Sequence, residues 1–155
     1  MTGLMSECVL GIALPGWFVK SVTVNRQDIT DVPRQFTQGD RVTILLTSTG
    51  STIEGTVTTR SGQPVTNGAV IMFGEDRAGW TTSSVRMRRA QLDRGGRFKM
   101  LGLLPGRYYI VAAARERVFQ PGFVEPSYFE ALAENATTIV MGEREQRVIA
   151  LTMSR

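Results

Sequence analysis

Short runs of alternating apolar and polar residues, separated by turn-forming residues, make up most of the chain. Successive side chains of a strand point to opposite faces, so this alternation predicts strands with one buried face. Valine, isoleucine, threonine and aromatic residues fill the runs, and glycine or proline lies between many of them. Runs spaced in this way are typical of an antiparallel sandwich or barrel. The predicted strands are 18–24, 42–47, 53–59, 69–73, 86–92, 97–101, 108–114, 137–141 and 147–153.

The segment 127–136 has the periodicity of a helix instead. Apolar residues recur there at four-residue spacing and so share one helical face: Tyr128, Leu132 and Ala136. Ser127 and Glu130 have the spacing of a capping box, and Pro126 would lie just before the cap. We therefore expect one short helix near the C-terminus.

The segment at residues 93–96 is a hairpin signal. Its sequence, Asp-Arg-Gly-Gly, offers glycines that can adopt positive φ. Phe98 and Tyr108 occupy alternating, inward positions of predicted strands and are expected to flank this hairpin. We expect both side chains to be largely buried.

A short motif occurs twice in the chain. LPGWFV at 14–19 resembles LPGRYY at 104–109, and RVTIL at 41–45 resembles RVIAL at 147–151. Coincidence between short strand motifs is one explanation. The other is that residues 1–47 are the C-terminal half of a preceding sandwich module, and residues 48–155 are a complete module.

The second explanation has a consequence for the N-terminal residues. The first module lacks its front strands in this chain, so its apolar residues would lack a full core. We expect residues 1–15 to be irregular or loosely packed, and residues 17–24 to pair marginally or to lean on the second module. The apolar residues concerned are Leu10, Ile12, Leu14, Trp17, Phe18 and Val22.

Turn and core motifs over residues 53–114 carry a family resemblance. In order they are GTV at 55–57, GQPV at 62–65, GAV at 68–70, D-x-x-G-x-F at 93–98, LPG at 104–106 and the run from Tyr108 to Ala112. This series resembles a carboxypeptidase regulatory-like domain, a transthyretin-like (prealbumin-like) β-sandwich of the carbohydrate-binding-like fold group. Residues 115–153 are similar to a bacterial subgroup in which a short helix, a strand, a Gly-Glu turn and a last strand follow. Thr59 departs from the family, which commonly has Asp or Asn there.

The resemblance implies a fold and a role. The fold is all-β, an antiparallel transthyretin-like (Ig-like) sandwich with one short helix near the C-terminus, preceded by a partial β module. The implied role is that of a non-catalytic accessory module, structural or interacting, in a larger extracytoplasmic bacterial protein. Its partners would be other domains of that protein or neighbouring repeats, with glycans as a second class of partner.

Composition narrows the chemistry that the chain can perform. Histidine is absent, which excludes Ser-His-Asp and Cys-His nucleophiles and all His-ligated metal sites. The single cysteine, Cys8, has no partner for an internal disulfide, and its apolar surroundings favour packing or incidental exposure over reactivity. Acidic residues are too scattered to predict a calcium site or a glycosidase pair. We expect no catalytic residue, cofactor or metal.

The sequence also contains no recognisable targeting signal. No apolar run approaches the length of about 20 residues that a membrane-spanning helix needs. The apolar run at 8–14 is short and no basic residue precedes it, so it does not match a secretory signal. The extracytoplasmic location therefore rests on the family resemblance.

A loop tryptophan is the first candidate for ligand contact. Trp80 lies in the sequence EDRAGWTT between two predicted strands, and its ring could stack on a sugar with hydrogen bonds from Asp76 and Arg77. The alternative is that Trp80 folds back over one end of the sandwich.

A basic stretch is the second candidate. Arg86 and Arg88 would share one face of a strand, and Arg89 lies beside them, so a basic stripe could meet phosphates or anionic polymers. No nucleic-acid motif accompanies the stretch, and aromatic residues are few within it. The chain carries 18 basic and 14 acidic residues, a net charge of +4. A solvated edge strand guarded by charge is the alternative, and it is favoured over nucleic-acid binding.

Overall fold

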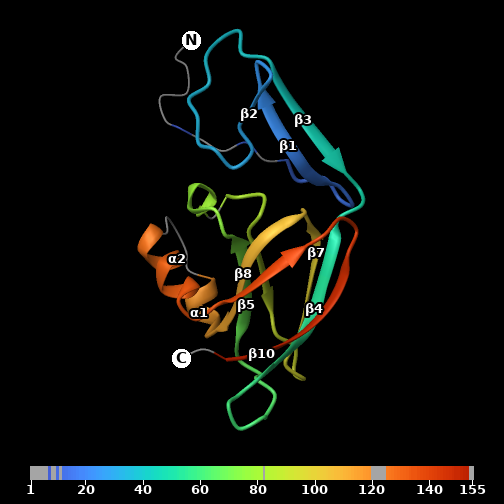
Figure 1. The fold of residues 1–155 in the computed structure, drawn as a ribbon, viewed down its shortest axis with the longest axis vertical. Coiled ribbons are helices and arrows are strands. Elements are labelled where there is room, and N and C mark those ends of the chain that lie inside the picture. Colours follow the sequence, from blue (N-terminus) through green and yellow to red (C-terminus); the bar gives the residue numbers. More distant parts are fainter. Residues whose placement is uncertain (1–6, 8–9, 11, 82, 120–124, 154–155) are drawn as a thin grey trace.

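The chain folds into a small N-terminal β unit stacked on one end of a β-sandwich (Figure 1). The computed structural model describes residues 7, 10, 12–81, 83–119 and 125–153. The N-terminal unit, residues 10–47, holds β1 (Phe18–Val24), β2 (Gln27–Asp28) and β3 (Val42–Thr47) in the order β2-β1-β3. All of its strand pairs are antiparallel.

The sandwich, residues 51–153, consists of two facing sheets. One sheet has the order β10-β4-β7, formed by β4 (Ser51–Thr58), β7 (Arg97–Leu103) and β10 (Gln146–Thr152). The other has the order β6-β5-β8-β9, formed by β5 (Ala69–Gly74), β6 (Arg88–Gln91), β8 (Gly106–Ala113) and β9 (Thr137–Met141). The predicted all-β class is therefore confirmed.

Two helices cover the outer face of the four-stranded sheet. They are α1 (Arg115–Val118) and α2 (Pro126–Ala133). Because this sheet is covered on both sides, every residue of β5 is buried. The helix α2 confirms the predicted segment, but Glu125 is the N-cap and Pro126 the first helical residue. Ser127 thus lies inside the helix, and the predicted capping box is wrong. The short helix α1 was not predicted.

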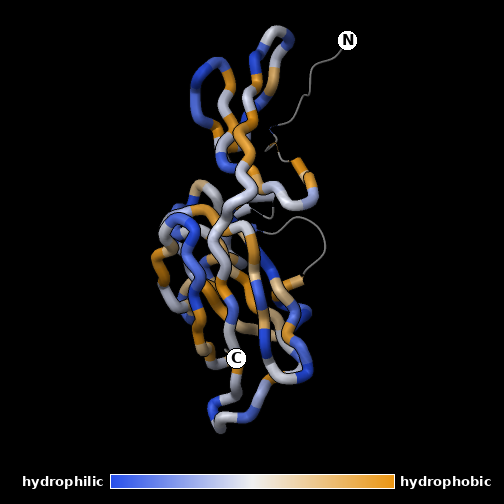
Figure 2. The backbone as a smooth tube through the Cα atoms, turned by 90° about the vertical axis from the view of Figure 1, so that its right-hand side faces the viewer, coloured by the Kyte–Doolittle hydropathy of each residue, from blue (hydrophilic) through white to orange (hydrophobic). Residues whose placement is uncertain are grey.

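Apolar side chains form one core between the two sheets and another beneath the helices. The inner core contains Ile53, Val57, Phe98, Tyr108 and Ile110 among others. Phe98 and Tyr108 are 4% and 0% exposed, which confirms the prediction for both residues. The second core joins Ile71 and Phe73 of β5 to Phe129 and Leu132 of α2. The alternating hydropathy of the strands is visible along the backbone in Figure 2.

One strand pair departs from the predicted antiparallel pattern. β10 pairs with β4 in parallel, with Ile149 beside Gly55. Gly55 is required here because a Cβ on it would lie 2.0 Å from the carbonyl oxygen of Ile149. The missing side chain lets the two backbones approach closely.

The turn at residues 93–96 has the expected positive φ, 72° at Gly96, but a different role. The Asp93 carboxylate accepts from the N–H groups of Gly95 and Arg97, at 2.8 and 2.9 Å. The flanking strands β6 and β7 belong to different sheets, so the expected two-stranded hairpin is wrong. The turn instead carries the chain from one layer of the sandwich to the other.

The N-terminal unit has a small core of its own. Val19, Val22, Val24 and Ile29 are buried, with Leu10, Phe36, Ile44 and Leu46 packed around them. Ile12, Leu14 and Trp17 remain about half exposed. Cys8 and most of the first eleven residues lie outside the described residues, so the expectations for them remain predictions.

Candidate functional site

A buried aspartate joins the N-terminal unit to the sandwich. Asp31 accepts a hydrogen bond from the Ser84 hydroxyl at 2.7 Å and another from the Val85 N–H at 2.6 Å. Both Asp31 and Ser84 are 7% exposed. The two sheets of the sandwich and the N-terminal sheet share no ladder, so these bonds are a principal polar link between the units.

Local structure holds Asp31 in place for this contact. The residue adopts a positive φ of 62°, a conformation that aspartate tolerates better than most side chains. The preceding turn is fastened to β1, because the Val22 N–H donates to the Thr30 hydroxyl at 2.8 Å. The Thr30 N–H in turn donates to the Asp28 carboxylate at 2.8 Å. Hydrogen bonds from the Thr30 side chain and from its N–H lower the pKa of Asp28.

Apolar contacts accompany the polar link. The ring of Phe18 lies over Gly102, where a Cβ would come within 2.1 Å of the ring. Gly102 has a positive φ of 70°, so a side chain at this position would be strained as well. Val85 of the sandwich packs against the N-terminal core. The joint is therefore built from both polar and apolar contacts.

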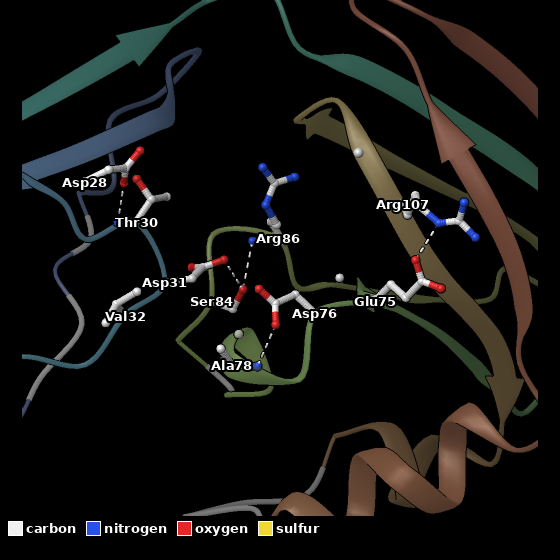
Figure 3. A pocket seen from close by; sticks show the side chains of 13 residues that line it. Asp28, Thr30, Asp31, Val32, Glu75, Asp76, Ala78, Ser84, Arg86 and Arg107 are labelled. Carbon is white, nitrogen blue, oxygen red and sulfur yellow. Dashed lines mark hydrogen bonds and ion pairs between the residues drawn. The ribbon is translucent and has the colours of Figure 1, made fainter.

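A polar cavity of about 580 Å³ lies beside the joint. Figure 3 shows side chains of both units around it, with Asp28, Thr30 and Asp31 from the N-terminal unit. The sandwich contributes two acidic and two basic residues: Glu75, Asp76, Arg86 and Arg107. Arg107 and Glu75 pair with each other at 2.5 Å. The cavity thus has the donors and acceptors to bind a small polar molecule.

Arg86 lines the cavity and is not part of a row of basic side chains. The predicted strand 86–92 includes Arg86, but β6 begins at Arg88, so Arg86 precedes the strand. Its guanidinium donates to the carbonyl of Pro105 at 2.8 Å and to the Tyr108 hydroxyl at 3.3 Å. The Tyr108 hydroxyl donates to the Leu104 carbonyl at 2.7 Å. Burial raises the pKa of Tyr108, so this hydroxyl stays protonated and keeps donating.

Arg88 is half-buried and is bonded to backbone carbonyls. Its guanidinium donates to Val85 and Met87 at 2.8 and 2.9 Å, to Gly102 at 3.0 Å and to Leu101 at 3.4 Å. Burial lowers the pKa of Arg88, and the carboxylate of Asp31 acts in the opposite direction. The side chain connects β6 to β7 across the edges of the two sheets, where the ladder hydrogen bonds end.

Arg89 lies on the other face of β6. It donates to the Val118 carbonyl at 3.3 Å, and its guanidinium lies 5.5 Å from the centre of the Phe119 ring. The structure therefore does not bring Arg86, Arg88 and Arg89 together on one surface. Arg86 and Arg88 both lie near Tyr108, whereas Arg89 contacts Val118 of α1.

Trp80 is a core residue, 7% exposed. Its indole N–H donates to the Gly74 carbonyl at 2.8 Å, and its ring packs against Phe73, Tyr109 and Phe129. The face that a sugar would need is thus covered, and Trp80 folds back over the sandwich as the alternative interpretation describes.

The neighbours of Trp80 have structural contacts of their own. Asp76 accepts from the Ala78 N–H at 3.0 Å and caps the short 3-10 helix Arg77–Gly79. Arg77 lies 5.2 Å from the centre of the Trp80 ring and forms an ion pair with Glu130 at 3.0 Å. Only Asp76 of the three predicted contact residues lines the junction cavity.

Sequence reasoning missed Asp31 as the joint. A signal was available, because a loop aspartate in a Thr-Asp-Val-Pro sequence often occupies a turn with special backbone geometry. Its partner was not predictable from local pattern, since Ser84 is 53 residues away along the chain.

Within the described residues, no group of three or more Cys, Asp or Glu is arranged to hold a metal ion. No helix of that part of the chain is long and apolar enough to cross a membrane.

The chain matches no family model and no curated protein sequence. Several solved structures resemble it at low identity. A DUF3823 family protein from Bacteroides ovatus is 13% identical, with 66% of this chain and 43% of that chain covered, and a TM-score of 0.42. The major pilin subunit of Bacillus cereus is 12% identical, with 74% and 33% covered, and a TM-score of 0.46.

A candidate carbohydrate-binding protein from Pseudomonas aeruginosa is 15% identical, with 67% of this chain and 88% of that chain covered, and a TM-score of 0.43. The chain spans less than half of the Bacteroides and Bacillus proteins. At these identities and TM-scores the matches carry no information on function, and the β-sandwich assignment rests on the strands described above.

Proposed function

We propose that this chain is a non-catalytic β-sandwich accessory module of a larger extracytoplasmic bacterial protein, where it joins neighbouring β units in a fixed arrangement. The observation that carries the proposal is the joint at Asp31. A buried carboxylate held by two hydrogen bonds from the next unit favours one orientation between the units. A spacer or connector needs this property, whereas a freely hinged linker would lack it.

The contacts of the charged side chains support the same proposal. Arg86, Arg88 and Arg89 donate to carbonyls of the chain itself, and Trp80 is buried. The residues that were predicted from the sequence to bind a ligand therefore stabilise the fold. The carboxypeptidase regulatory-like assignment, and the division into a half module at 1–47 and a complete module at 48–155, belong to this proposal.

The partners that we propose are other domains of the parent protein or neighbouring repeats. Residues 10–47 form three strands around a small core, as the end of a longer module would. The free end of that unit would meet the preceding domain. Nucleic acid is not among the proposed partners, because Arg86, Arg88 and Arg89 donate to carbonyls of the chain itself.

The two tryptophans provide a direct test, since Trp17 lies in the N-terminal unit and Trp80 in the sandwich. Urea unfolding is followed by fluorescence in the single-tryptophan variants Trp80→Phe and Trp17→Phe. A fixed joint predicts that the two units unfold together, so each variant shows the same midpoint by fluorescence and by circular dichroism. In the Asp31→Ala background, Trp17 should report unfolding at a lower urea concentration than Trp80. Independent unfolding of the units in the unmodified background would refute the proposal.

A second candidate function is carbohydrate binding, and one observation favours it. The junction cavity has carboxylates and two guanidinium groups suited to hydroxyl groups, although it is separate from the covered face of Trp80. A glycan array with the whole chain tests this candidate. Binding that is lost in Asp76→Ala and kept in Trp80→Phe would support a saccharide site in the cavity.

A further inference from the structure

We propose that the free edge of β3 is a strand-pairing surface, and that its partner is β3 of a second copy of this chain. β3 lies at one end of the sheet order β2-β1-β3. One of its edges pairs with β1, and no described strand pairs with the other. A strand edge with unpaired N–H and C=O groups is a template for a further strand.

Hydrogen bonds identify the residues of β3 that face β1. The Asn25 N–H donates to the Arg41 carbonyl at 3.0 Å, so Arg41 faces β1 just before β3 begins. The direction of the backbone N–H and C=O groups alternates from one residue of a strand to the next. Thr43 and Leu45 therefore also direct these groups towards β1.

The intervening residues of β3 therefore face the free edge. Val22 of β1, which lies opposite Ile44, gives independent support for this assignment. Its N–H donates to the Thr30 hydroxyl and its carbonyl accepts from the Ile29 N–H, both on the side away from β3. The backbone groups of Ile44, and by alternation those of Val42 and Leu46, point away from β1.

The β3 edge lacks the features that usually protect an edge strand. Its sequence, VTILLT, has no charge and no proline. Three other edge strands carry basic residues, namely β6, β7 and β10, and β2 has only two residues. Charged edge residues discourage pairing, so β3 differs from these strands in the way that an interaction surface would. β9 is also uncharged and serves below as the matched control.

The pattern of β3 is self-complementary about a twofold axis at Leu45. In that antiparallel register Leu45 lies opposite its own copy, Ile44 opposite Leu46, and Thr43 opposite Thr47. On each face, side chains of the same kind lie opposite each other. Apolar pairs and threonine pairs are cross-strand combinations that stabilise sheets. The side chain of Leu45, 51% exposed in the single chain, would be covered by its copy. Pairing thus forms one six-stranded sheet.

Hydrogen exchange at two protein concentrations tests the proposal without any substitution. We expect the Ile44 and Leu46 amides, which face outward, to gain at least about tenfold protection between about 10 µM and about 1 mM protein. The Thr43 and Leu45 amides already bond within the sheet, so their protection should change much less. Equal protection of all four amides at both concentrations would overturn the proposal.

Sedimentation velocity with two matched variants tests the location of the surface. The chain should show a concentration-dependent equilibrium between monomer and dimer. Leu45→Lys places two like charges opposite each other across the axis and should leave a monomer. Val140→Lys introduces the same charge at a 53% exposed position on β9 and should leave the dimer intact. A monomer at every concentration, or a dimer lost only in Val140→Lys, would refute pairing through β3.

Discussion

The Ser84 hydroxyl donates to the Asp31 carboxylate at 2.7 Å, across the boundary between the N-terminal unit and the sandwich. Asp31 follows β2 and Ser84 precedes β6, so the contact fixes two loops to each other rather than two strands. Burial strengthens such a contact because water does not compete for the carboxylate. The orientation of the two units thus depends on few residues.

The parallel pair of β4 and β10 predicts a strong effect for Gly55→Ala. The added Cβ would lie 2.0 Å from a backbone oxygen, which cannot move without opening the sheet. We expect a loss of at least about 3 kcal/mol in the free energy of unfolding, measured by urea denaturation. Gly74→Ala is the control, because its Cβ would meet only the flexible Arg86 side chain at 3.4 Å. Similar losses for both variants would contradict the close approach of β10 to β4.

The four carbonyl contacts of the half-buried Arg88 guanidinium predict that its removal destabilises the sandwich. Arg88→Met leaves carbonyls of Leu101 and Gly102 without their donor, at an expected loss of about 2–4 kcal/mol in the free energy of unfolding. Arg94→Met, at an exposed turn position, should change stability by less than about 0.5 kcal/mol. An Arg88→Met variant as stable as the Arg94→Met variant would show that Arg88 is a solvated surface residue.

Acid titration of stability tests the turn at Asp93. Hydrogen bonds from the Arg97 and Gly95 N–H groups lower the pKa of Asp93 in the folded chain. Its contribution is therefore complete above the unfolded pKa of about 3.9 and is lost as pH falls through the lower folded pKa. We expect Asp93→Asn, which keeps an acceptor oxygen, to reduce the slope of stability against pH below about pH 4. An unchanged slope would mean that the Asp93 charge does not contribute.

Fluorescence quenching distinguishes a core role for Trp80 from a ligand-stacking role. In Trp17→Phe the remaining tryptophan is 7% exposed, so acrylamide should quench it weakly. In Trp80→Phe the remaining Trp17 is 46% exposed and should be quenched readily. Strong quenching of Trp80 would restore the sugar-stacking hypothesis.

Local patterns were sufficient to predict most strands and the helix α2. Alternation in segments such as 18–24, 42–47 and 137–141 depends only on which face of a strand is buried, and the structure places strands over the same residues. Burial of Phe98 and Tyr108 follows from the same pattern. Interactions between distant residues were not predictable in this way.

Two positions show where sequence reasoning reaches its limit. Parallel pairing of β10 with β4 depends on the space left by Gly55, which a single sequence does not distinguish from a turn glycine. Arg88 reads as a surface residue in a strand pattern, yet it turns inward because backbone carbonyls of β7 need donors at the sheet edge. Both outcomes depend on how the sheets pack together.

The distance between one label in each unit is the most direct test of the fixed joint. Because Cys8 is the single cysteine, a Cys8→Ser background accepts spin labels at Gln27→Cys on β2 and Thr56→Cys on β4, both exposed positions. Pulsed electron paramagnetic resonance on magnetically diluted samples, in which unlabelled chain excludes distances between copies, should give one narrow distance distribution. Adding Asp31→Ala should broaden it. A distribution that is already broad with Asp31 present would contradict the account.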